Sequence, residues 1–170
     1  MKLKPVYING EWVVNMTSEQ KRQSLQKPGK RKKGTKSSGK PMTALDRKKA
    51  NVGSKYWRDK ADKIWSQLVK RDERCAVCGR MDIKRDSHHL LSRGKVMTRH
   101  DLENGMLLCV THHLYSPDCS PHAGPIGFVE WLEENHPEKL EWVRQNRNRT
   151  GKPDYKANYE RLKRELDKSF

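Results

Sequence analysis

Apolar side chains recur at helical spacing along the stretch that follows Ser54. They fall at relative positions i, i+4, i+7, i+8 and i+11 and comprise Trp57, Ala61, Ile64, Trp65 and Leu68. This stripe predicts an amphipathic helix with one buried side, and Ser54 is a suitable N-cap for it. The same spacing returns near the C-terminus in Tyr155, Tyr159, Leu162 and Leu166. Residues 151–170 are therefore expected to contain a helix that packs on the domain.

Shorter elements are expected elsewhere along the chain. The stretch FVEWLEENHPEKLEWV predicts two short helices separated at His136-Pro137, because proline disfavours helical backbone in the residue before it. Residues 84–91 and 106–109 can each be extended, with a long loop between them and a helix beginning near Val110. The predicted fold class is α+β.

The N-terminal run VYINGEWVV places two apolar segments around Asn-Gly, which predicts a hairpin within residues 1–20. A lone hairpin is marginally stable in water, so this one docks either on the domain or on a partner.

Composition separates a folded centre from basic flanking segments. Of the 170 residues, 33% are hydrophobic, the mean hydropathy is −1.09 and the formal net charge is +16, which fits one domain plus tails. Residues 21–49 carry twelve Lys or Arg and one Asp, whereas residues 75–143 carry seven basic and ten acidic side chains. Residues 144–170 carry nine basic and four acidic ones. The expected partner is a polyanion, most commonly nucleic acid.

The run KPGKRKKGTKSSGKP, residues 27–41, lacks apolar side chains and is expected to belong to a disordered, flexible basic linker over residues 21–53. Its cluster of Lys30, Arg31, Lys32 and Lys33 would hold phosphates, since a basic arm gains affinity from released counterions. The alternative is a linker that only improves solubility.

The sequence lacks the features of membrane and secreted proteins. No apolar run approaches the roughly 20 residues of a bilayer-spanning helix, and MKLKPVYINGEW lacks the apolar stretch of a secretory signal. The four cysteines include a C-x-x-C pair, which suits reduced thiols better than a disulfide framework. The expected location is the cytoplasm.

Two short motifs predict a structural zinc site. Cys75-x-x-Cys78 and Cys109-x-x-His112 have the spacing of two zinc knuckles, each of which brings two ligands to one point. Four protein ligands close such a site, so its Zn²⁺ would be structural. Two alternatives stay open: the cysteines are unrelated buried residues, or Cys119 replaces His112 as a ligand.

A second set of side chains remains once the zinc ligands are assigned, namely His88, His89, Asn104 and His113. Neighbouring residues of a strand point to opposite faces. His88 and His89 are therefore expected to differ in role, with one binding a metal and the other accepting a proton. His100 and His136 are expected to be surface residues.

The motifs CAVC, SHH, ENG and LLCVTHH follow one another between residues 75 and 113, and in this order they resemble the HNH, or ββα-metal, endonucleases of the phage type. The resemblance implies a zinc-stapled ββα-metal core within residues 54–150, flanked by helices. It implies that His89 is the general base, that Asn104 orients this base, and that His88 and His113 bind the catalytic ion. The segment KADKIWSQLVKRD also resembles the entry helix of phage recombination nucleases of the NinG/Rap type.

Two positions depart from the family pattern. The second knuckle usually ends in Cys, where this chain has His112, and the position of His88 is more often Asp. A histidine there makes the site less anionic, so that Mn²⁺, Ni²⁺ or Zn²⁺ suits it better than Mg²⁺ alone. A further family histidine falls on His122. The alternative is that His122 only precedes or caps the helix that carries Phe128 and Trp131.

The implied function is hydrolysis of DNA phosphodiester bonds by a one-metal mechanism, on duplex, nicked or branched DNA. Arg93, Lys95 and Arg99 lie in the bracketed loop, where they either grip the DNA backbone or are solvated charges. Phage replication, recombination or packaging proteins are candidate partners, and a phage-encoded chain would act in the host cytoplasm. The competing hypothesis is a non-catalytic zinc-containing module that only binds nucleic acid.

Overall fold

The computed structural model describes residues 6–8, 11–13 and 41–168 and divides the chain into two units, Met1–Pro41 and Met42–Phe170. In the first unit, strands β1 (Val6–Ile8) and β2 (Glu11–Val13) pair antiparallel, which confirms the predicted hairpin. The cluster of Lys30, Arg31, Lys32 and Lys33 lies outside the described residues.

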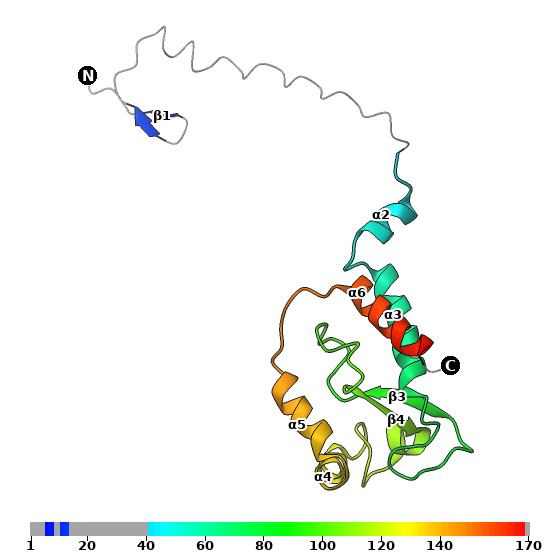
Figure 1. Cartoon of the computed structure of the whole chain (residues 1–170). Coiled ribbons are helices and arrows are strands. Elements are labelled where there is room, and N and C mark those ends of the chain that lie inside the picture. Colours follow the sequence, from blue (N-terminus) through cyan, green and yellow to red (C-terminus); the bar gives the residue numbers. More distant parts are fainter. Residues whose placement is uncertain (1–5, 9–10, 14–40, 169–170) are drawn as a thin grey trace. The chain divides into compact units, whose positions relative to one another are not determined.

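The second unit combines helices with a two-stranded antiparallel sheet, as the predicted α+β class requires (Figure 1). Its elements are α2 (Ala44–Ala50), α3 (Lys55–Val69), β3 (Arg85–His89), β4 (Gly105–Cys109), η1 (Thr111–Tyr115), α4 (Pro125–Asn135), α5 (Pro137–Asn146) and α6 (Tyr155–Asp167). None of the helices in the described part of the chain has the length and apolar character needed to span a bilayer.

Helix α2 corrects the predicted flexible linker at residues 44–50, while residues 21–40 of that linker lie outside the described residues. The hydroxyl of Thr43 accepts a hydrogen bond from the Asp46 backbone N–H, and the Asp46 carboxylate accepts one from the Thr43 backbone N–H, both at 3.1 Å. This reciprocal capping box satisfies two N–H groups that a helix start otherwise leaves unpaired. No residue of α2 is buried, so this cap and the hydrogen bonds from Ser54 and Trp57 to the α2 carbonyls of Lys48 and Lys49 hold the helix in place of a hydrophobic core.

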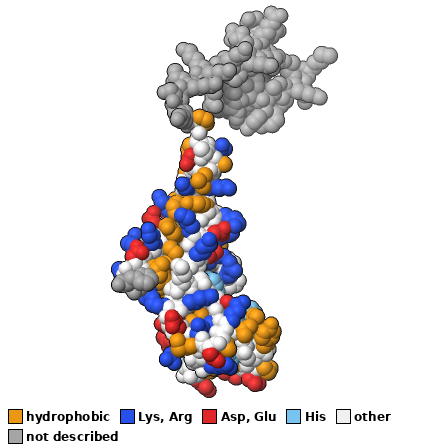
Figure 2. All heavy atoms as spheres, turned by 90° about the vertical axis from the view of Figure 1, so that its right-hand side faces the viewer, with side chains coloured by type: hydrophobic (Ala, Val, Ile, Leu, Met, Phe, Trp, Pro, Cys, Tyr) orange, Lys and Arg blue, Asp and Glu red, His pale blue; other side chains and the backbone are white. Residues whose placement is uncertain are grey.

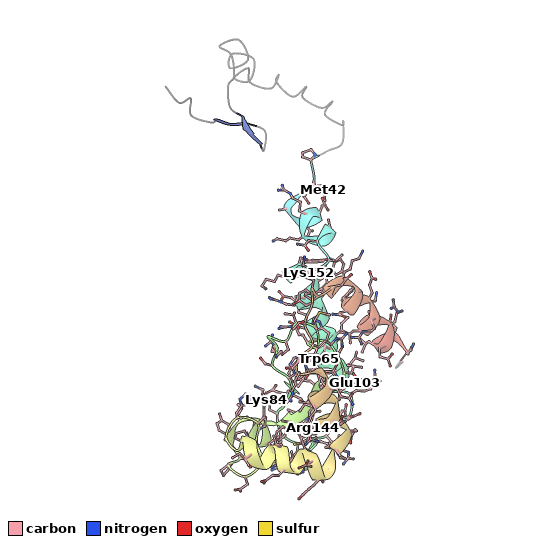
Figure 3. All side chains as sticks on the ribbon, turned by 90° about the vertical axis from the view of Figure 1, so that its left-hand side faces the viewer. Met42, Trp65, Lys84, Glu103, Arg144 and Lys152 are labelled. Atoms are coloured by element: carbon pink, nitrogen blue, oxygen red, sulfur yellow. The ribbon has the colours of Figure 1, made fainter. Side chains whose placement is uncertain are left out.

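Helices α3 and α6 pack against each other through their predicted apolar stripes. Ala61, Trp65, Leu68 and Leu162 are buried together, with Tyr159 and Leu166 partly buried beside them. Ser54 stands at the N-cap of α3, but its hydroxyl donates to the Lys48 carbonyl at 2.7 Å instead of capping the helix. In Figure 3, Trp65 lies between Met42, which precedes α2, and Arg144 of α5.

Strands β3 and β4 pair in the predicted region, with His88 opposite Met106 and His89 opposite Gly105. All five residues of β4 are buried, and Met106 and Leu108 form a second core with Phe128 and Leu132 of α4. The helix expected near Val110 is the single π-helical turn η1, which ends before Pro117. The break at His136-Pro137 is confirmed, because α4 ends at Asn135 and α5 begins at Pro137.

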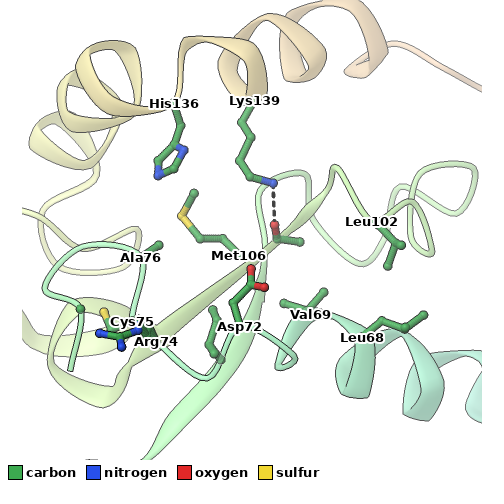
Figure 4. Close-up of a pocket in the computed structure, with 13 residues that line it drawn as sticks. Leu68, Val69, Asp72, Arg74, Cys75, Ala76, Leu102, Met106, His136 and Lys139 are labelled. Carbon is green, nitrogen blue, oxygen red and sulfur yellow. Dashed lines mark hydrogen bonds between the residues drawn. The ribbon is translucent and has the colours of Figure 1, made fainter. Parts of the chain in front are cut away.

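The outer edge of β4 is covered by hydrogen bonds. The Ala76 backbone N–H donates to the Leu107 carbonyl at 2.9 Å, and the Lys139 ammonium of α5 donates to the Gly105 carbonyl at 2.9 Å (Figure 4). A pocket of about 540 Å³ lies here between α3, β4 and α5, with Met106 and His136 among its lining residues.

Replacing Leu162 by Ala should lower the free energy of unfolding by about 2–5 kcal/mol, because the side chain is fully buried between α3 and α6. Urea denaturation of the purified protein measures this change. The exposed neighbour Lys163, replaced by Ala, should change it by less than about 0.5 kcal/mol. Equal midpoints for the two variants would show that α6 is not part of the core.

Candidate metal centres and the histidine pocket

Cys75, Cys78, Cys109 and His112 lie close together and could bind a metal such as zinc. Their ligand atoms all lie within 4.8 Å of one another. The sulfur atoms of Cys78 and Cys109 are 3.9 Å apart, and Nδ1 of His112 is 3.2 Å from the Cys109 sulfur. Sulfur atoms bound about 2.3 Å from a tetrahedral ion lie about 3.8 Å apart, so the spacing fits one shared Zn²⁺ rather than a disulfide.

Two tight turns bring these ligands together. In the first knuckle, the Gly79 N–H donates to the Cys75 carbonyl at 2.8 Å, and Gly79 has a φ of 69° that glycine adopts without strain. In the second, the His112 N–H points to the Cys109 sulfur at 3.5 Å. Burial raises the pKa of the Cys78 thiol to about 11, so metal binding at this cluster must displace protons.

Cys119 stands outside this cluster. It is partly buried and packs against the core that contains Phe128 and Leu132. His112 is therefore the fourth member of the group, and Cys119 does not take its place.

The side chains of His88, His113 and His122 form a second group that could hold a metal ion. Nε2 of His113 lies 3.1 Å from Nδ1 of His88, and the His122 ring centroid lies 5.1 Å and 5.5 Å from those of His113 and His88. Two nitrogens bound about 2.1 Å from one ion lie about 3.0–3.4 Å apart. The three imidazoles therefore fit a transition-metal ion.

Ser120 brings His122 back to the cluster across the long gap from His113. The buried Ser120 hydroxyl donates to the His113 carbonyl at 2.9 Å and accepts the N–H groups of His122 and Ala123, each at 3.2 Å. Gly124 allows the turn to close, because a Cβ atom there would lie 2.0 Å from the Pro117 carbonyl oxygen. Sequence analysis did not identify Ser120, since no spacing rule marks a serine in this role.

His89 points away from these three rings, as expected for the neighbour of His88 on a strand. Its ring stacks on Trp65 with centroids 3.7 Å apart and an interplanar angle of 18°. Its Nε2 lies 3.0 Å from the Arg99 carbonyl oxygen. Because a carbonyl only accepts, Nε2 carries the proton and Nδ1 holds the free lone pair. Among the residues described, none forms a hydrogen bond with this Nδ1.

Burial keeps His88, His89 and His113 neutral at neutral pH. It lowers the pKa of His88 to about 3, and the neighbouring His113 and His122 rings add to the shift. Burial also lowers the pKa of His89 to about 4, with the positive charges of Arg93 and Arg99 contributing. The pKa of His113 is lowered for the same reason, by burial and by His122. Neutral imidazoles are the form that binds metal ions.

Asn104 holds the loop between β3 and β4, and its side chain forms hydrogen bonds with loop backbone groups rather than with the His89 ring. Its amide donates to the carbonyls of Leu91 and Thr98 at 3.2 and 3.0 Å, and its side-chain oxygen accepts from the Leu91 N–H at 2.6 Å. The side chain is fully buried. It therefore sets the course of the loop that carries the Arg99 carbonyl, and orients His89 only through that loop.

Arg99 is not available to grip DNA, contrary to the sequence-based prediction. Its guanidinium makes two 2.8 Å hydrogen bonds to the Asp62 carboxylate and one of 2.7 Å to the Arg93 carbonyl. His100 is also buried rather than exposed, and its Nε2 lies 2.9 Å from Asp62. Arg93 and Lys95 keep exposed side chains. These two residues are the loop cations that can reach a solvent anion.

A pocket of about 490 Å³ joins the two histidine environments, with His88, His89, Arg93, His113 and His122 among its lining residues. Figure 2 shows Lys and Arg side chains spread over the face that α3 and α6 present.

Comparisons with protein-family models, with curated proteins and with solved structures found no match.

Replacing Cys78 by Ser should release the bound zinc and lower the midpoint of thermal unfolding, because the cluster keeps only three ligands. Zinc content, measured with a chromogenic chelator, and the thermal transition test this. Cys119→Ser is the matched control and should keep both the zinc and the midpoint. A Cys78→Ser protein with the zinc content of the wild type would remove Cys78 from the ligand set.

Proposed function

We propose that this protein is a metal-dependent DNA endonuclease that uses a one-metal HNH mechanism. One observation carries the proposal: the imidazoles of His88, His113 and His122 lie close enough to share one ion, while His89, which lines the same pocket, keeps one ring nitrogen without a hydrogen bond. A zinc-binding module that only holds nucleic acid would need neither the second cluster nor this arrangement.

The order of elements supports the proposed ββα-metal core. Strand β3 carries His88 and His89, strand β4 leads into the second knuckle, and η1 carries His113. The ligands of the Cys75, Cys78, Cys109 and His112 cluster come from the segment before β3 and from the end of β4 and η1. Bound zinc would therefore fix the distance between these two segments. This is the arrangement that the resemblance to HNH nucleases implies.

His88, His113 and His122 would hold the catalytic ion. A bound divalent ion would stabilise the negative charge that develops on the phosphate and on the leaving oxygen. A set of three imidazole nitrogens favours Mn²⁺, Ni²⁺ or Zn²⁺ over Mg²⁺, which prefers oxygen ligands and retains several waters.

His89 would act as the general base. Its Nδ1 removes a proton from a water molecule, the water oxygen bonds to phosphorus, and the bond from phosphorus to the 3′ oxygen breaks. The 3′ oxygen leaves with the electron pair of that bond and takes a proton from water, so the products carry 5′-phosphate and 3′-hydroxyl ends. The stacked Trp65 ring and the Arg99 carbonyl hold the His89 ring in place as it gains and loses a proton.

DNA is the proposed substrate because of the charge of the chain. The net charge of +16 favours a polyanion, and the side chain of Arg93, 65% exposed, borders the histidine pocket. Lys95 and the cluster of Lys30, Arg31, Lys32 and Lys33 are further proposed phosphate contacts. By resemblance, phage recombination, replication or packaging proteins are proposed partners.

Replacing His89 by Ala should abolish DNA cleavage and leave DNA affinity unchanged, because the base is lost while the charged surface remains. General-base catalysis contributes roughly 10²–10⁴-fold, so the cleavage rate should fall by at least about a hundredfold. The assay uses linear, nicked, branched and single-stranded DNA with Mg²⁺, Mn²⁺, Ni²⁺ or Zn²⁺. His136→Ala, which lies outside the histidine pocket, is the control and should cleave normally.

Normal cleavage by the His89→Ala variant would refute the base assignment. Wild-type protein that binds all these DNAs and cleaves none of them with any ion would favour the competing hypothesis of a zinc-containing binding module.

Replacing His122 by Ala should raise the metal concentration for half-maximal cleavage by about tenfold or more, because the ion keeps only two imidazole ligands. A titration of activity with Mn²⁺ in the variant and the wild type measures this shift. An unchanged half-saturating concentration would exclude His122 as a ligand and leave an ion held by His88 and His113.

A further inference from the structure

Helix α3 supplies two side chains to the surroundings of His89. Asp62 and Trp65 stand three residues apart and therefore lie on the same side of the helix. Trp65 is 2% exposed, stacks on the His89 ring and donates its indole N–H to the Asp101 carbonyl at 2.9 Å. The tryptophan thus contacts both the ring and the loop that binds the ring.

Asp62 anchors that same loop from its other side. One carboxylate oxygen accepts from Nε of Arg99 and Nε2 of His100, and the other accepts from Nη2 of Arg99, all at 2.8–2.9 Å. Burial raises the pKa of Asp62, but the bonds from Arg99 and His100 outweigh it and hold the pKa well below its usual range. The carboxylate is therefore charged and pairs with both loop residues.

Hydrogen bonds connect Asp62 to His89 through Arg99. The residue whose guanidinium Asp62 holds, Arg99, is also the residue whose carbonyl accepts Nε2–H of His89. Its side chain is only 10% exposed, and its remaining Nη1 donor is bonded to the Arg93 carbonyl. The carbonyl therefore has little freedom to move away from His89.

Gly105 makes room for the stack. It lies opposite His89 in the β3–β4 register, and a Cβ atom there would lie 3.1 Å from Cζ2 of Trp65 and 2.4 Å from a Val69 methyl carbon. The cross-strand position that would normally hold a side chain is occupied by α3 instead. The arrangement of His89, Trp65 and Asp62 is thus built into the packing of α3 on the sheet.

We propose that Asp62 and Trp65 are positioning residues for His89. Trp65 sets the plane of the imidazole, and Asp62, through Arg99, places the carbonyl that binds Nε2–H, so that the lone pair stays on Nδ1. The inference rests on the proposed function in one respect only, since it assigns a use to the ring that these residues hold.

The first test compares Asp62→Asn with Asp59→Asn. Asparagine offers Arg99 one acceptor in place of two and cannot form the charged pair, whereas Asp59, one turn earlier on α3, binds Lys55 and Arg58 and forms no hydrogen bond with the loop. Single-turnover cleavage by Asp62→Asn should fall about tenfold to a hundredfold. Its DNA affinity and half-saturating Mn²⁺ concentration should stay within about twofold of the wild type. Asp59→Asn should cleave at the wild-type rate.

The second test observes the His89 ring directly and needs no cleavage. Ring ¹⁵N chemical shifts of the zinc-loaded protein report which nitrogen carries the proton, and His89→Gln assigns the signals. The wild type should show protonated Nε2 and bare Nδ1, and Asp62→Asn should show a mixture of both tautomers. Arg99→Lys, which keeps the ion pair but loses the two parallel hydrogen bonds, should show the same mixture even if Asp62→Asn does not fold.

Wild-type tautomer and wild-type cleavage in both Asp62→Asn and Arg99→Lys would overturn the proposal. Failure of the proposed function looks different: the wild type would not cleave DNA, yet the tautomer of His89 would still respond to Asp62→Asn. Equal losses in Asp59→Asn and Asp62→Asn would also overturn it, because a general weakening of α3 would then explain the effect.

Discussion

Two neighbouring residues of an extended strand cannot face the same side of a sheet, and the candidate site depends on that constraint at His88 and His89. One ring turns toward His113 and His122, and the other turns toward Trp65 on α3. A candidate metal ligand and the proposed base thereby stand side by side in sequence, with their rings in different surroundings. A shift of the β3–β4 register by one residue would exchange the environments of the two rings.

The loops on either side of the strands are held in different ways. The loop between β3 and β4 is fixed by buried polar groups, with Asn104 bonded to Leu91 and Thr98 and with Arg99 bonded to Asp62. The segment after η1 is fixed by the Ser120 hydroxyl and by the absence of a side chain at Gly124. Leu90, Leu91 and Leu102 add apolar contacts to the first of these loops. Hydrogen bonds and, at the knuckles, the metal that the Cys/His cluster could bind therefore supplement the hydrophobic packing of this small domain.

The regular elements and the Cys/His cluster could be predicted from sequence because each follows a local period or spacing. The α3 stripe and the break at His136-Pro137 are of this kind. Arg99 and His100 were misplaced because their partner, Asp62, lies 37 and 38 residues away, and no periodicity links a loop cation to one helical carboxylate. Thr43 and Asp46 have the spacing of a capping box and could have predicted the start of α2. The basic composition of the surrounding segment instead led to the prediction of a flexible linker.

The hydrogen bonds that cover the outer edge of β4 also bear on whether another chain can add a strand there. An unpaired strand edge is a template on which another chain can add a strand, and proteins prevent this by occupying or charging that edge. Here the Leu107 carbonyl is bound by the knuckle backbone, and the Gly105 carbonyl is bound by an ammonium group that brings its positive charge to the edge. An incoming strand would have to displace both. The knuckle and α5 thus protect a short, fully buried strand from edge-to-edge aggregation.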